Sequence, residues 1–351
     1  MKRRNFLISA GAAATATISG CLAPSSGGVG SDSLVVGTYS SFIDSPSSAP
    51  GAWLKSEFES EFDIDLVWQT PSNELNHYVQ RKQANVDIEA DVYLGVNPDD
   101  LVRIDEELDE SLFAESGDIE GTSDVKSGLQ FDPQNRAVPY DTGYISLVYD
   151  STQMTAPETF EGLLAEDVRG DLIAQNPGSS ATGRAFLLHT IKQYGPDEYL
   201  DYWADLQAND VQVLGSWSDA YGAWSSGEAP MVVSYSTDQV FADGQDANLE
   251  KHQIRFLNDQ GYANPEGMAR FADSNQTEAA RKFMEFVLRP EIQGEIAVKN
   301  VQFPATSNAE VPSDYAKLAK EPPEPVTFTY EELKGQVSGW VEDWERQFAS
   351  N

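Results

Sequence analysis

The chain has 351 residues, of which 57 are acidic and 23 basic, so its formal charge at pH 7 is -34. A surface this negative repels nucleic acid and anionic lipid, which argues against both as partners of the folded part. The one cysteine and the three histidines (Cys21, His77, His189, His252) provide no disulfide and no paired metal ligands, and neither GxxxxGK[ST] nor GxSxG occurs, so we expect no metal and no cofactor. The charge is spread along the chain, as in proteins of salt-loving organisms. Because the screening length falls to about 3 Å at molar salt, ligand binding must depend on contact chemistry.

The first residues form an export signal. Arg3 and Arg4 precede an apolar stretch of small residues that ends in ISGC at Cys21. The paired arginines predict twin-arginine export, and the ISGC end resembles a lipoprotein signal whose cysteine takes a lipid. We expect residues 1–20 to be the signal, Cys21 to be the site of lipid attachment, and residues 21–32, rich in Ser and Gly, to be a flexible tether.

Strand and helix patterns alternate through the first third of the chain. Apolar runs predict strands over Leu34–Gly37, Ile64–Trp68 and Ala90–Gly95, and helical spacing predicts a helix over Ala52–Phe62, with a further helix capped by Ser72. The alternation indicates a parallel sheet, in which ligands bind beyond the carboxyl ends of the strands. Tyr39 and Asn97 follow two of these ends, although capping of a helix at Pro98 is the simpler role for Asn97.

The segment Ala137–Tyr149 is extended and apolar but is interrupted by Pro139, Asp141 and Gly143. About 320 residues after the tether exceed what a single core usually organises, so two lobes are expected. We interpret Ala137–Tyr149 as the hinge between them, with an irregular edge strand as the alternative. The expected lobes are discontinuous: residues 33–138 with 256–310, and residues 139–255 with 311–351.

A candidate binding region precedes the helix predicted over Arg184–Tyr194. The run NPGSSATG brings Ser179, Ser180 and Thr182 to the helix N-terminus. Its free amide hydrogens and positive dipole end suit an anionic or polar ligand group. Capping of the helix by one of these hydroxyl groups is an equally good interpretation.

Residues 211–237, VQVLGSWSDAYGAWSSGEAPMVVSYST, form the strongest candidate for a binding site. Both predicted strands of this stretch, the second over Met231–Tyr235, end in aromatic and hydroxyl side chains. Trp217, which opens a helix, and Tyr235 and Thr237 are thus placed where an open α/β sheet binds its ligand. Ordinary core packing is the alternative for the two aromatic residues.

Toward the C-terminus, Ile254–Phe256 and Gly267–Phe271 are expected to be strands that return to the first lobe, and Thr277–Leu288 a helix. One final helix is expected from Leu333 to Phe348, where apolar residues recur every three or four positions. That stripe indicates core packing.

Several motifs, in their order and spacing, resemble those of the thiamine-binding periplasmic proteins: GTYSSF, ADVYLG, VPYDTGYISLVYD, SWSDAYGAWSSGE, VVSYST and GWVEDWERQF. The resemblance covers residues 34–348 and is most specific from SWSDAYG to SYST. It implies an α/β periplasmic-binding-protein fold of type II, with a ligand cleft between two hinged lobes. It also implies an exported, lipid-anchored, monomeric solute-binding component of an ABC importer. Such a protein delivers thiamine or its phosphate esters to a permease driven by a separate ATPase.

Carried over by position, the resemblance also implies ligand contacts. Tyr39 would stack on the aminopyrimidine ring, and the remaining contacts would come from Ser179, Ser180, Trp217, Tyr235, Thr237 and Phe241. Of these, Ser179, Ser180, Trp217 and Tyr235 would meet the hydroxyethyl or phosphate end. Aromatic faces attract a desolvated cation such as the thiazolium by about 0.5 to 2 kcal/mol each. The chain departs from the family at Phe241, where a tyrosine is usual, and at Val301, where a tryptophan is usual.

Two other functions fit parts of the sequence. A polyamine is also cationic, and Asp141, Asp219 and Asp238 are candidates for binding one, whereas iron(III) would need the adjacent tyrosines of related iron binders. A thiamine-processing enzyme of the same architecture needs a cysteine nucleophile, and Cys21 stands at the lipid-attachment position. We therefore expect a binding protein and not an enzyme.

Overall fold

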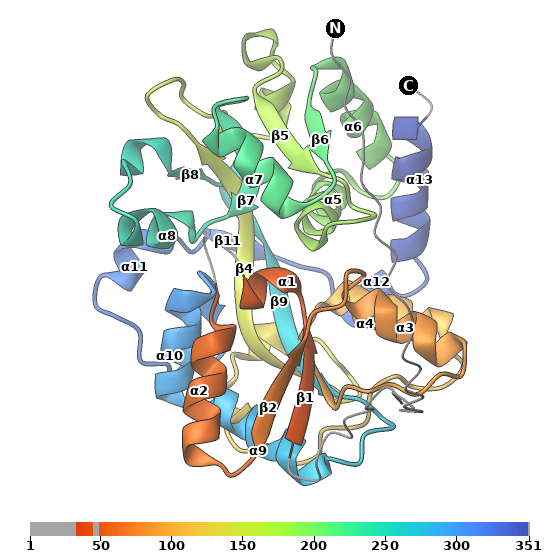
Figure 1. The fold of residues 1–351 in the computed structure, drawn as a ribbon. Coiled ribbons are helices and arrows are strands. Elements are labelled where there is room, and N and C mark those ends of the chain that lie inside the picture. The colour runs from red at the N-terminus through yellow and green to blue at the C-terminus, as the bar shows by residue number, and fades with distance from the viewer. Residues whose placement is uncertain (1–32, 45–48, 350–351) are drawn as a thin grey trace, which may run out of the picture.

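The computed structural model describes residues 33–44 and 49–349 (Figure 1). The expected signal and the whole of the expected tether, including Cys21, lie outside the described residues. Within the described part, one sheet contains β1 (Ser33–Thr38), β2 (Asp65–Gln69), β3 (Val92–Val96), β4 (Ala137–Tyr149), β5 (Leu172–Gln175), β6 (Gln212–Leu214), β7 (Met231–Tyr235), β8 (Gln253–Arg255), β9 (Gln260–Arg270), β10 (Phe303–Pro304) and β11 (Glu324–Val326).

Helices follow most of these strands and cover the sheet. They are α1 (Ser40–Ile43), α2 (Gly51–Glu61), α3 (Leu75–Gln83), α4 (Pro98–Glu107), α5 (Ala181–Tyr194), α6 (Tyr199–Ala208), α7 (Trp217–Ser225), α8 (Asp238–Gly244), α9 (Thr277–Val287), α10 (Pro290–Lys299), α11 (Tyr315–Leu318), α12 (Tyr330–Leu333) and α13 (Val337–Ala349). None of these described helices is both long and apolar enough to cross a membrane.

The sheet is mixed, with the order β2-β1-β3-β9-β4-β7-β5-β6. The expected parallel pairing holds between β1 and its neighbours β2 and β3, and again between β5 and its neighbours β6 and β7. The two long central strands, β4 and β9, run antiparallel to each other, and β9 is antiparallel to β3 and β4 to β7. Each parallel group is therefore a separate βα unit, and the antiparallel pair joins the two.

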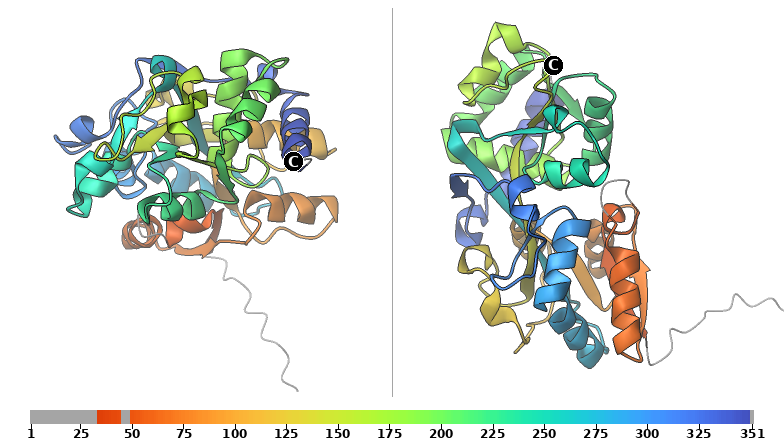
Figure 2. Two further views of the ribbon diagram at one scale, coloured as in Figure 1. Left: turned by 90° about the horizontal axis from the view of Figure 1, so that it is seen from above. Right: turned by 90° about the vertical axis from the view of Figure 1, so that its left-hand side faces the viewer.

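Two lobes lie one above the other (Figures 1 and 2). We call lobe 1 the part built on β1, β2 and β3, and lobe 2 the part built on β5, β6 and β7. The first part of β4, from Ala137 to Ile145, pairs with β9 and, at Asp141 and Thr142, with β10, whereas its second part, from Ile145 to Tyr149, pairs with β7 of lobe 2 and with β8. Both β4 and β9 thus run through the waist of the molecule. The hinge role and the lobe boundaries given above stay predictions.

One alternative interpretation and three expectations about local structure were wrong. The segment Ala137–Tyr149 is one continuous strand at the centre of the sheet and not at its edge. The strand expected at Ile254–Phe256 is β8, which pairs with the lobe 2 half of β4 and does not return to lobe 1. The final helix is broken into α12 and α13, because Gly335 between them has φ 73°. Ser72 does not cap α3, whose first turn follows Glu74 without a side-chain cap.

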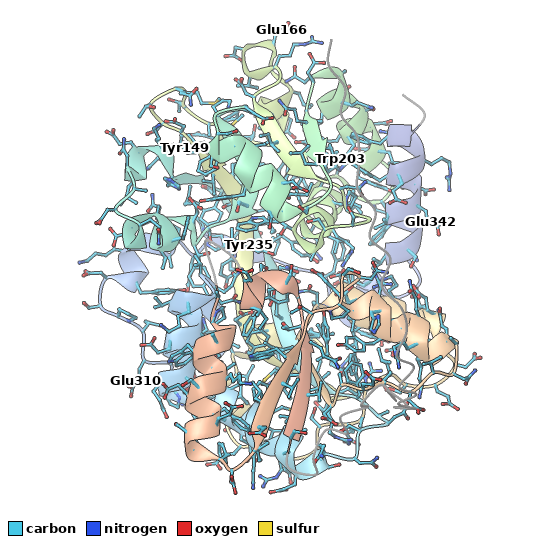
Figure 3. The ribbon with its side chains drawn as sticks, in the orientation of Figure 1. Tyr149, Glu166, Trp203, Tyr235, Glu310 and Glu342 are labelled. Carbon is cyan, nitrogen blue, oxygen red and sulfur yellow. The ribbon has the colours of Figure 1, made fainter. Side chains whose placement is uncertain are left out.

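Two large groups of buried side chains hold the lobes. One lies in lobe 1, where Phe58 of α2 packs edge-on against Phe283 of α9 with ring centroids 5.5 Å apart. The other runs from Tyr93 in lobe 1 to Trp203 and Trp344 in lobe 2, where Figure 3 shows Trp203 inside the upper lobe. Because this second core is continuous through the central strands, the waist is a packed structure.

Candidate functional site

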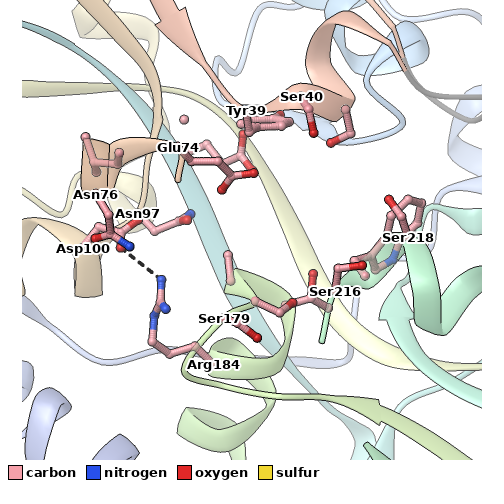
Figure 4. A pocket seen from close by; sticks show the side chains of 18 of the residues that line it. Tyr39, Ser40, Glu74, Asn76, Asn97, Asp100, Ser179, Arg184, Ser216 and Ser218 are labelled. Carbon is pink, nitrogen blue, oxygen red and sulfur yellow. Dashed lines mark hydrogen bonds and ion pairs between the residues drawn. The ribbon is translucent and has the colours of Figure 1, made fainter. Parts of the chain in front are cut away.

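A cavity of about 930 Å³ lies between the two lobes. Lobe 1 contributes the end of β1, the approach to α3 and the segment after α10, and lobe 2 contributes the first turns of α5, α7 and α8 (Figure 4). All seven predicted ligand-binding residues line it: Tyr39, Ser179, Ser180, Trp217, Tyr235, Thr237 and Phe241. Residues that are up to 202 positions apart in the chain therefore meet at one crevice.

The ring of Tyr39 lies against the backbone of Gly95 in β3. Gly95 has φ +115°, and a Cβ atom there would stand 2.7 Å from the ring. The Tyr39 hydroxyl donates to Glu266 Oε2 at 2.8 Å and accepts from Asn300 Nδ2 at 3.0 Å. The glycine leaves room for the ring, and the two hydrogen bonds fix its orientation at the cavity wall.

Two carboxylates are partners across β4 and β9: Asp141, which is fully buried, and Glu266, which is half-buried. Glu266 Oε2 also accepts from the Tyr140 hydroxyl at 2.5 Å, and Asp141 Oδ2 accepts from Asn300 Nδ2 at 2.7 Å. Burial raises the pKa of Glu266 to about 6, and burial together with Glu266 raises the pKa of Asp141 well above its usual range. Glu266 lines the cavity whereas Asp141 is fully buried, so Glu266 is the member of the pair that a cationic ligand can meet.

Trp217 is held in place from two sides at the start of α7. Its Nε1 donates to Ser234 Oγ at 3.0 Å, and its ring stacks on Tyr221 with centroids 5.0 Å apart and planes at 27°. The Tyr221 hydroxyl in turn donates to Asp238 Oδ1 at 2.5 Å. This chain of contacts orients the indole ring toward the cavity through hydrogen bonds within lobe 2 alone.

Tyr235 ends β7 at the waist between the lobes (Figure 3). Its hydroxyl accepts from Thr182 Oγ1 at 3.3 Å and from Asn264 Nδ2 at 3.2 Å, and burial raises its pKa to about 12. A Cβ atom at Gly143 would stand 2.2 Å from the ring, so the glycine of the VPYDTGY motif leaves the space for this tyrosine.

The two serines before α5 have different local roles. Ser180 is the N-cap, and its hydroxyl accepts from Gly183 N at 3.3 Å, so the capping interpretation is confirmed for it. Ser179 Oγ donates to the Gly215 carbonyl at 2.7 Å, which ties the start of α5 to the turn before α7. Both residues still line the cavity.

A hydrogen bond joins lobe 2 to the segment after α10. Thr237 Oγ1 donates to the Val301 carbonyl at 2.5 Å. Val301 has φ 55°, a left-handed conformation that a β-branched residue rarely adopts and that costs about 1 to 3 kcal/mol. Val301 lines the cavity at the position where a tryptophan is usual in the thiamine-binding periplasmic proteins. Phe241, the other departure from that family, packs edge-on against Tyr221 with ring centroids 6.4 Å apart.

The cavity wall is strongly acidic. Its ionisable side chains are the carboxylates Glu74, Asp100, Glu107, Asp238, Glu266 and Glu342 and the guanidinium groups Arg103 and Arg184. Six negative groups against two positive ones give the wall a formal charge of -4. With six aromatic residues at the same wall, the arrangement suits a flat or apolar ligand that carries positive charge.

Residues 53–323 match the family model of bacterial extracellular solute-binding proteins. The chain belongs to this family. It is 30% identical to the thiamine-binding periplasmic protein of Escherichia coli (strain K12) over 314 residues, which are 89% of this chain and 92% of that one. It is 28% identical to the thiamine-binding periplasmic protein of Brucella abortus biovar 1 (strain 9-941) over 315 residues, 89% and 91% of the two chains.

Two solved structures share the fold. A periplasmic thiamin binding protein superposes with a TM-score of 0.79 and 29% identity, covering 90% of this chain and 96% of the other. The ferric binding protein from Campylobacter jejuni superposes with a TM-score of 0.73 at 17% identity, covering 90% and 99%, which shows the architecture alone. The expected two-lobed fold of type II periplasmic binding proteins is thus confirmed, and the relatives are transport proteins that bind solutes.

Sequence reasoning missed several residues of the cavity wall. Glu266 lies inside β9, whose start was predicted too late, at Gly267, so the glutamate fell outside the expected strand. Arg184 is a cation in the first turn of a helix, where acidic residues are favoured, and this too was a usable signal. Asn97 lines the cavity and stands at the N-cap position of α4, but its Nδ2 donates to the Pro265 carbonyl at 2.9 Å and its side chain makes no capping hydrogen bond.

Proposed function

We propose that this solute-binding protein captures thiamine or one of its phosphate esters outside the cell membrane and delivers it to the permease of an ABC importer. The observation that carries the proposal is the meeting of Tyr39 from lobe 1 with Trp217 and Tyr235 from lobe 2 at one acidic cavity. Thiamine joins a flat aminopyrimidine to a cationic thiazolium, and aromatic faces and carboxylates suit both parts. The relatives named as thiamine-binding proteins match 89% of the chain, which supports the same ligand.

Each wall residue then has a role. Tyr39, whose ring lies against Gly95 and lines the cavity, stacks on the aminopyrimidine. Ser179, Ser180, Trp217 and Tyr235 contact the hydroxyethyl or phosphate end, with Thr237 and Phe241 beside them. Because residues of both lobes contact the ligand, binding favours the closed arrangement of the lobes, and the permease recognises that arrangement.

Isothermal titration of the purified protein with thiamine tests the proposal. Saturable binding with a change in tryptophan fluorescence supports it, since Trp217 lines the cavity. Unchanged fluorescence and an unchanged melting temperature with thiamine, while a different solute shifts both, would show that the ligand is wrong.

A polyamine is the second candidate, because the cavity wall carries the formal charge of -4. Of the three aspartates expected to bind one, Asp238 lines the cavity, Asp141 is fully buried and Asp219 lies on the exposed side of α7. Only one of the three is therefore available to a ligand in the cavity. A spermidine titration beside the thiamine titration separates the two ligands.

Export, lipid anchoring, a monomeric state and the absence of enzymatic activity complete the proposal. The ISGC sequence supports lipid attachment at Cys21, and mass spectrometry of the membrane-bound protein and of a Cys21→Ala variant tests it. Replacing Arg3 and Arg4 with lysine tests the twin-arginine route by loss of export. Light scattering measures the oligomeric state, and incubation with thiamine followed by a search for a cleaved pyrimidine product tests for catalysis.

A further inference from the structure

His252 is not one of the residues that line the ligand cavity, but it contacts one that does. Its Nδ1 stands 2.6 Å from Oδ2 of Asp238, which lines the cavity at the start of α8. A carboxylate can only accept a hydrogen bond, so Nδ1 is the donor. The side chains of His252 and Asp238 are 14% and 4% exposed, so water competes little for this bond. The histidine therefore supports the cavity wall from behind.

The support continues through Tyr221 to the indole ring of Trp217. Asp238 Oδ1 accepts from the Tyr221 hydroxyl at 2.5 Å, and the Tyr221 ring stacks on that of Trp217. Burial and the Asp238 carboxylate raise the pKa of Tyr221 above its ordinary range, so the hydroxyl keeps the hydrogen that it donates. We call the series His252, Asp238, Tyr221 and Trp217 the tryptophan support. Its last three members line the cavity.

His252 fixes the orientation of the Asp238 carboxylate. A hydrogen bond to one oxygen alone leaves a carboxylate able to turn about its Cβ–Cγ bond, because torsions of this kind have broad minima. Hydrogen bonds to both oxygens fix the plane of the group, and with it the direction in which Oδ1 meets the Tyr221 hydroxyl. Binding groups need such outer partners to stay within the narrow range of positions that a ligand requires. Loss of the His252 donor should therefore loosen Tyr221 and the ring stacked on it.

The imidazole ring of His252 also has a packing contact. It lies edge-on to Trp224, with ring centroids 5.1 Å apart and planes at 85°. Trp224 is a buried residue of α7 and belongs to the core of lobe 2. A merely structural role for His252 would depend on this ring contact, whereas a positioning role depends on the Nδ1 donor. Because the two roles belong to different atoms, substitutions can separate them.

We propose that His252 is a positioning residue that holds Trp217 at the cavity wall through the tryptophan support. This inference rests on the proposed function, in which Trp217 contacts thiamine. The indole is held a second time by Ser234 Oγ, which accepts from its Nε1 at 3.0 Å, so loss of His252 weakens ligand binding without abolishing it. Tyr39, the ring contributed by lobe 1, is oriented by separate hydrogen bonds and keeps its contact.

Isothermal titration of the full protein with thiamine tests the inference in two variants. His252→Asn keeps an N–H donor near the position of Nδ1 but removes the ring, whereas His252→Phe keeps a ring beside Trp224 but has no donor. We expect the Kd of His252→Phe to rise by about 2- to 10-fold, the contribution of one aromatic contact, and that of His252→Asn to stay near its wild-type value. Normal binding by His252→Phe, or binding by His252→Asn as weak as that of His252→Phe, overturns the inference.

A double-mutant cycle shows whether the effect passes through Tyr221. In a Tyr221→Phe background the hydroxyl that meets Asp238 is absent, so His252→Phe should raise the Kd no further. An undiminished rise there means that His252 acts by another route and also overturns the inference. Urea unfolding shows that each variant is folded, and His252→Leu, which lacks a donor too, replaces His252→Phe if that variant does not fold.

The matched control is His77→Phe in α3. His77 packs edge-on against Tyr78 and is not among the described residues of the cavity wall, so this variant should bind thiamine with an unchanged Kd. Absence of thiamine binding by the wild-type protein refutes the proposed function itself. Wild-type binding that no His252 variant alters overturns the inference alone and leaves the proposed function standing.

Discussion

Gly95 is the position at which a single methyl group should disturb both folding and binding. In Gly95→Ala the new Cβ would stand 2.7 and 2.8 Å from two carbons of the Tyr39 ring. Carbon atoms in contact sit about 3.5 to 4.0 Å apart, so the ring must move by about 0.8 Å or more. Alanine is also disfavoured at φ +115°. This backbone strain costs about 1 to 3 kcal/mol, and a weakened hydrogen bond from Tyr39 to Glu266 adds about 1 kcal/mol.

The same displacement should weaken ligand binding. If Tyr39 stacks on the ligand, loss of that contact removes about 0.5 to 2 kcal/mol, which corresponds to a roughly 2- to 30-fold higher Kd for thiamine. Urea unfolding measures the stability change, and isothermal titration measures the affinity. The control is Gly339→Ala in α13, where a Cβ atom meets nothing within 4 Å and the helical position is exposed. That variant should gain about 0.5 to 1 kcal/mol of stability and bind normally.

A double-mutant cycle isolates the contact with Tyr39. In a Tyr39→Ala background, Gly95→Ala retains its backbone strain but loses the steric conflict, so its cost should be smaller by about 1 kcal/mol or more. Full stability and unchanged affinity in Gly95→Ala would refute the account. Equal costs in both backgrounds would show that strain alone acts and that the glycine does not serve the ring.

Three further changes test other parts of the structure. Burial raises the pKa of Glu266 to about 6, so ionisation of this carboxyl destabilises the folded state at any pH above the ordinary pKa of a glutamate. Glu266→Gln should therefore raise the free energy of unfolding at pH 7 by about 2 kcal/mol. Urea titrations below about pH 4 should show no such gain, since the carboxyl is then protonated in both states. Val301→Asn should raise stability by about 1 kcal/mol, because Asn tolerates φ 55°; a lower melting temperature would contradict the strain. Arg136→Ala leaves the buried carboxylate of Asp132 uncompensated at a cost of about 3 to 5 kcal/mol, whereas Arg169→Ala at the surface should leave the melting temperature unchanged.

The sequence predicted site residues correctly where a recognisable strand pattern could be combined with a rule about where ligands bind on a sheet. The apolar runs of β1 and β7 could be recognised directly, and in an α/β sheet the residues after such strands point to the ligand side. Tyr39 and Tyr235 were therefore predictable as neighbours although they lie 196 positions apart. The break between α12 and α13 was hidden because Leu333 and Val337 keep a helical spacing and both face the core on either side of Gly335.

Contacts between the two lobes could not be predicted from local sequence patterns. Acidic residues such as Asp99 and Asp100 are common in the first turn of a helix, because the helix dipole favours them there. Nothing in the sequence therefore linked them to Arg184, which forms ion pairs with both and lies 84 positions after Asp100. The same holds for the bond from Thr237 to the Val301 carbonyl, which spans 64 positions and requires a backbone conformation that valine does not predict. These contacts follow from tertiary packing and not from propensity.

The distribution of charge separates two roles for the acidic residues. Outside the cavity, carboxylates such as Glu61 and Glu278 are paired with exposed arginines and face solvent, where molar salt screens them beyond about 3 Å. Inside it, Glu266 accepts hydrogen bonds at 2.5 and 2.8 Å from two tyrosines, and one of these is the ring proposed to stack on the ligand. Interactions at contact distance in a buried wall are little affected by salt. The surface charge can therefore serve solubility, while capture of the ligand depends on the few groups that touch it.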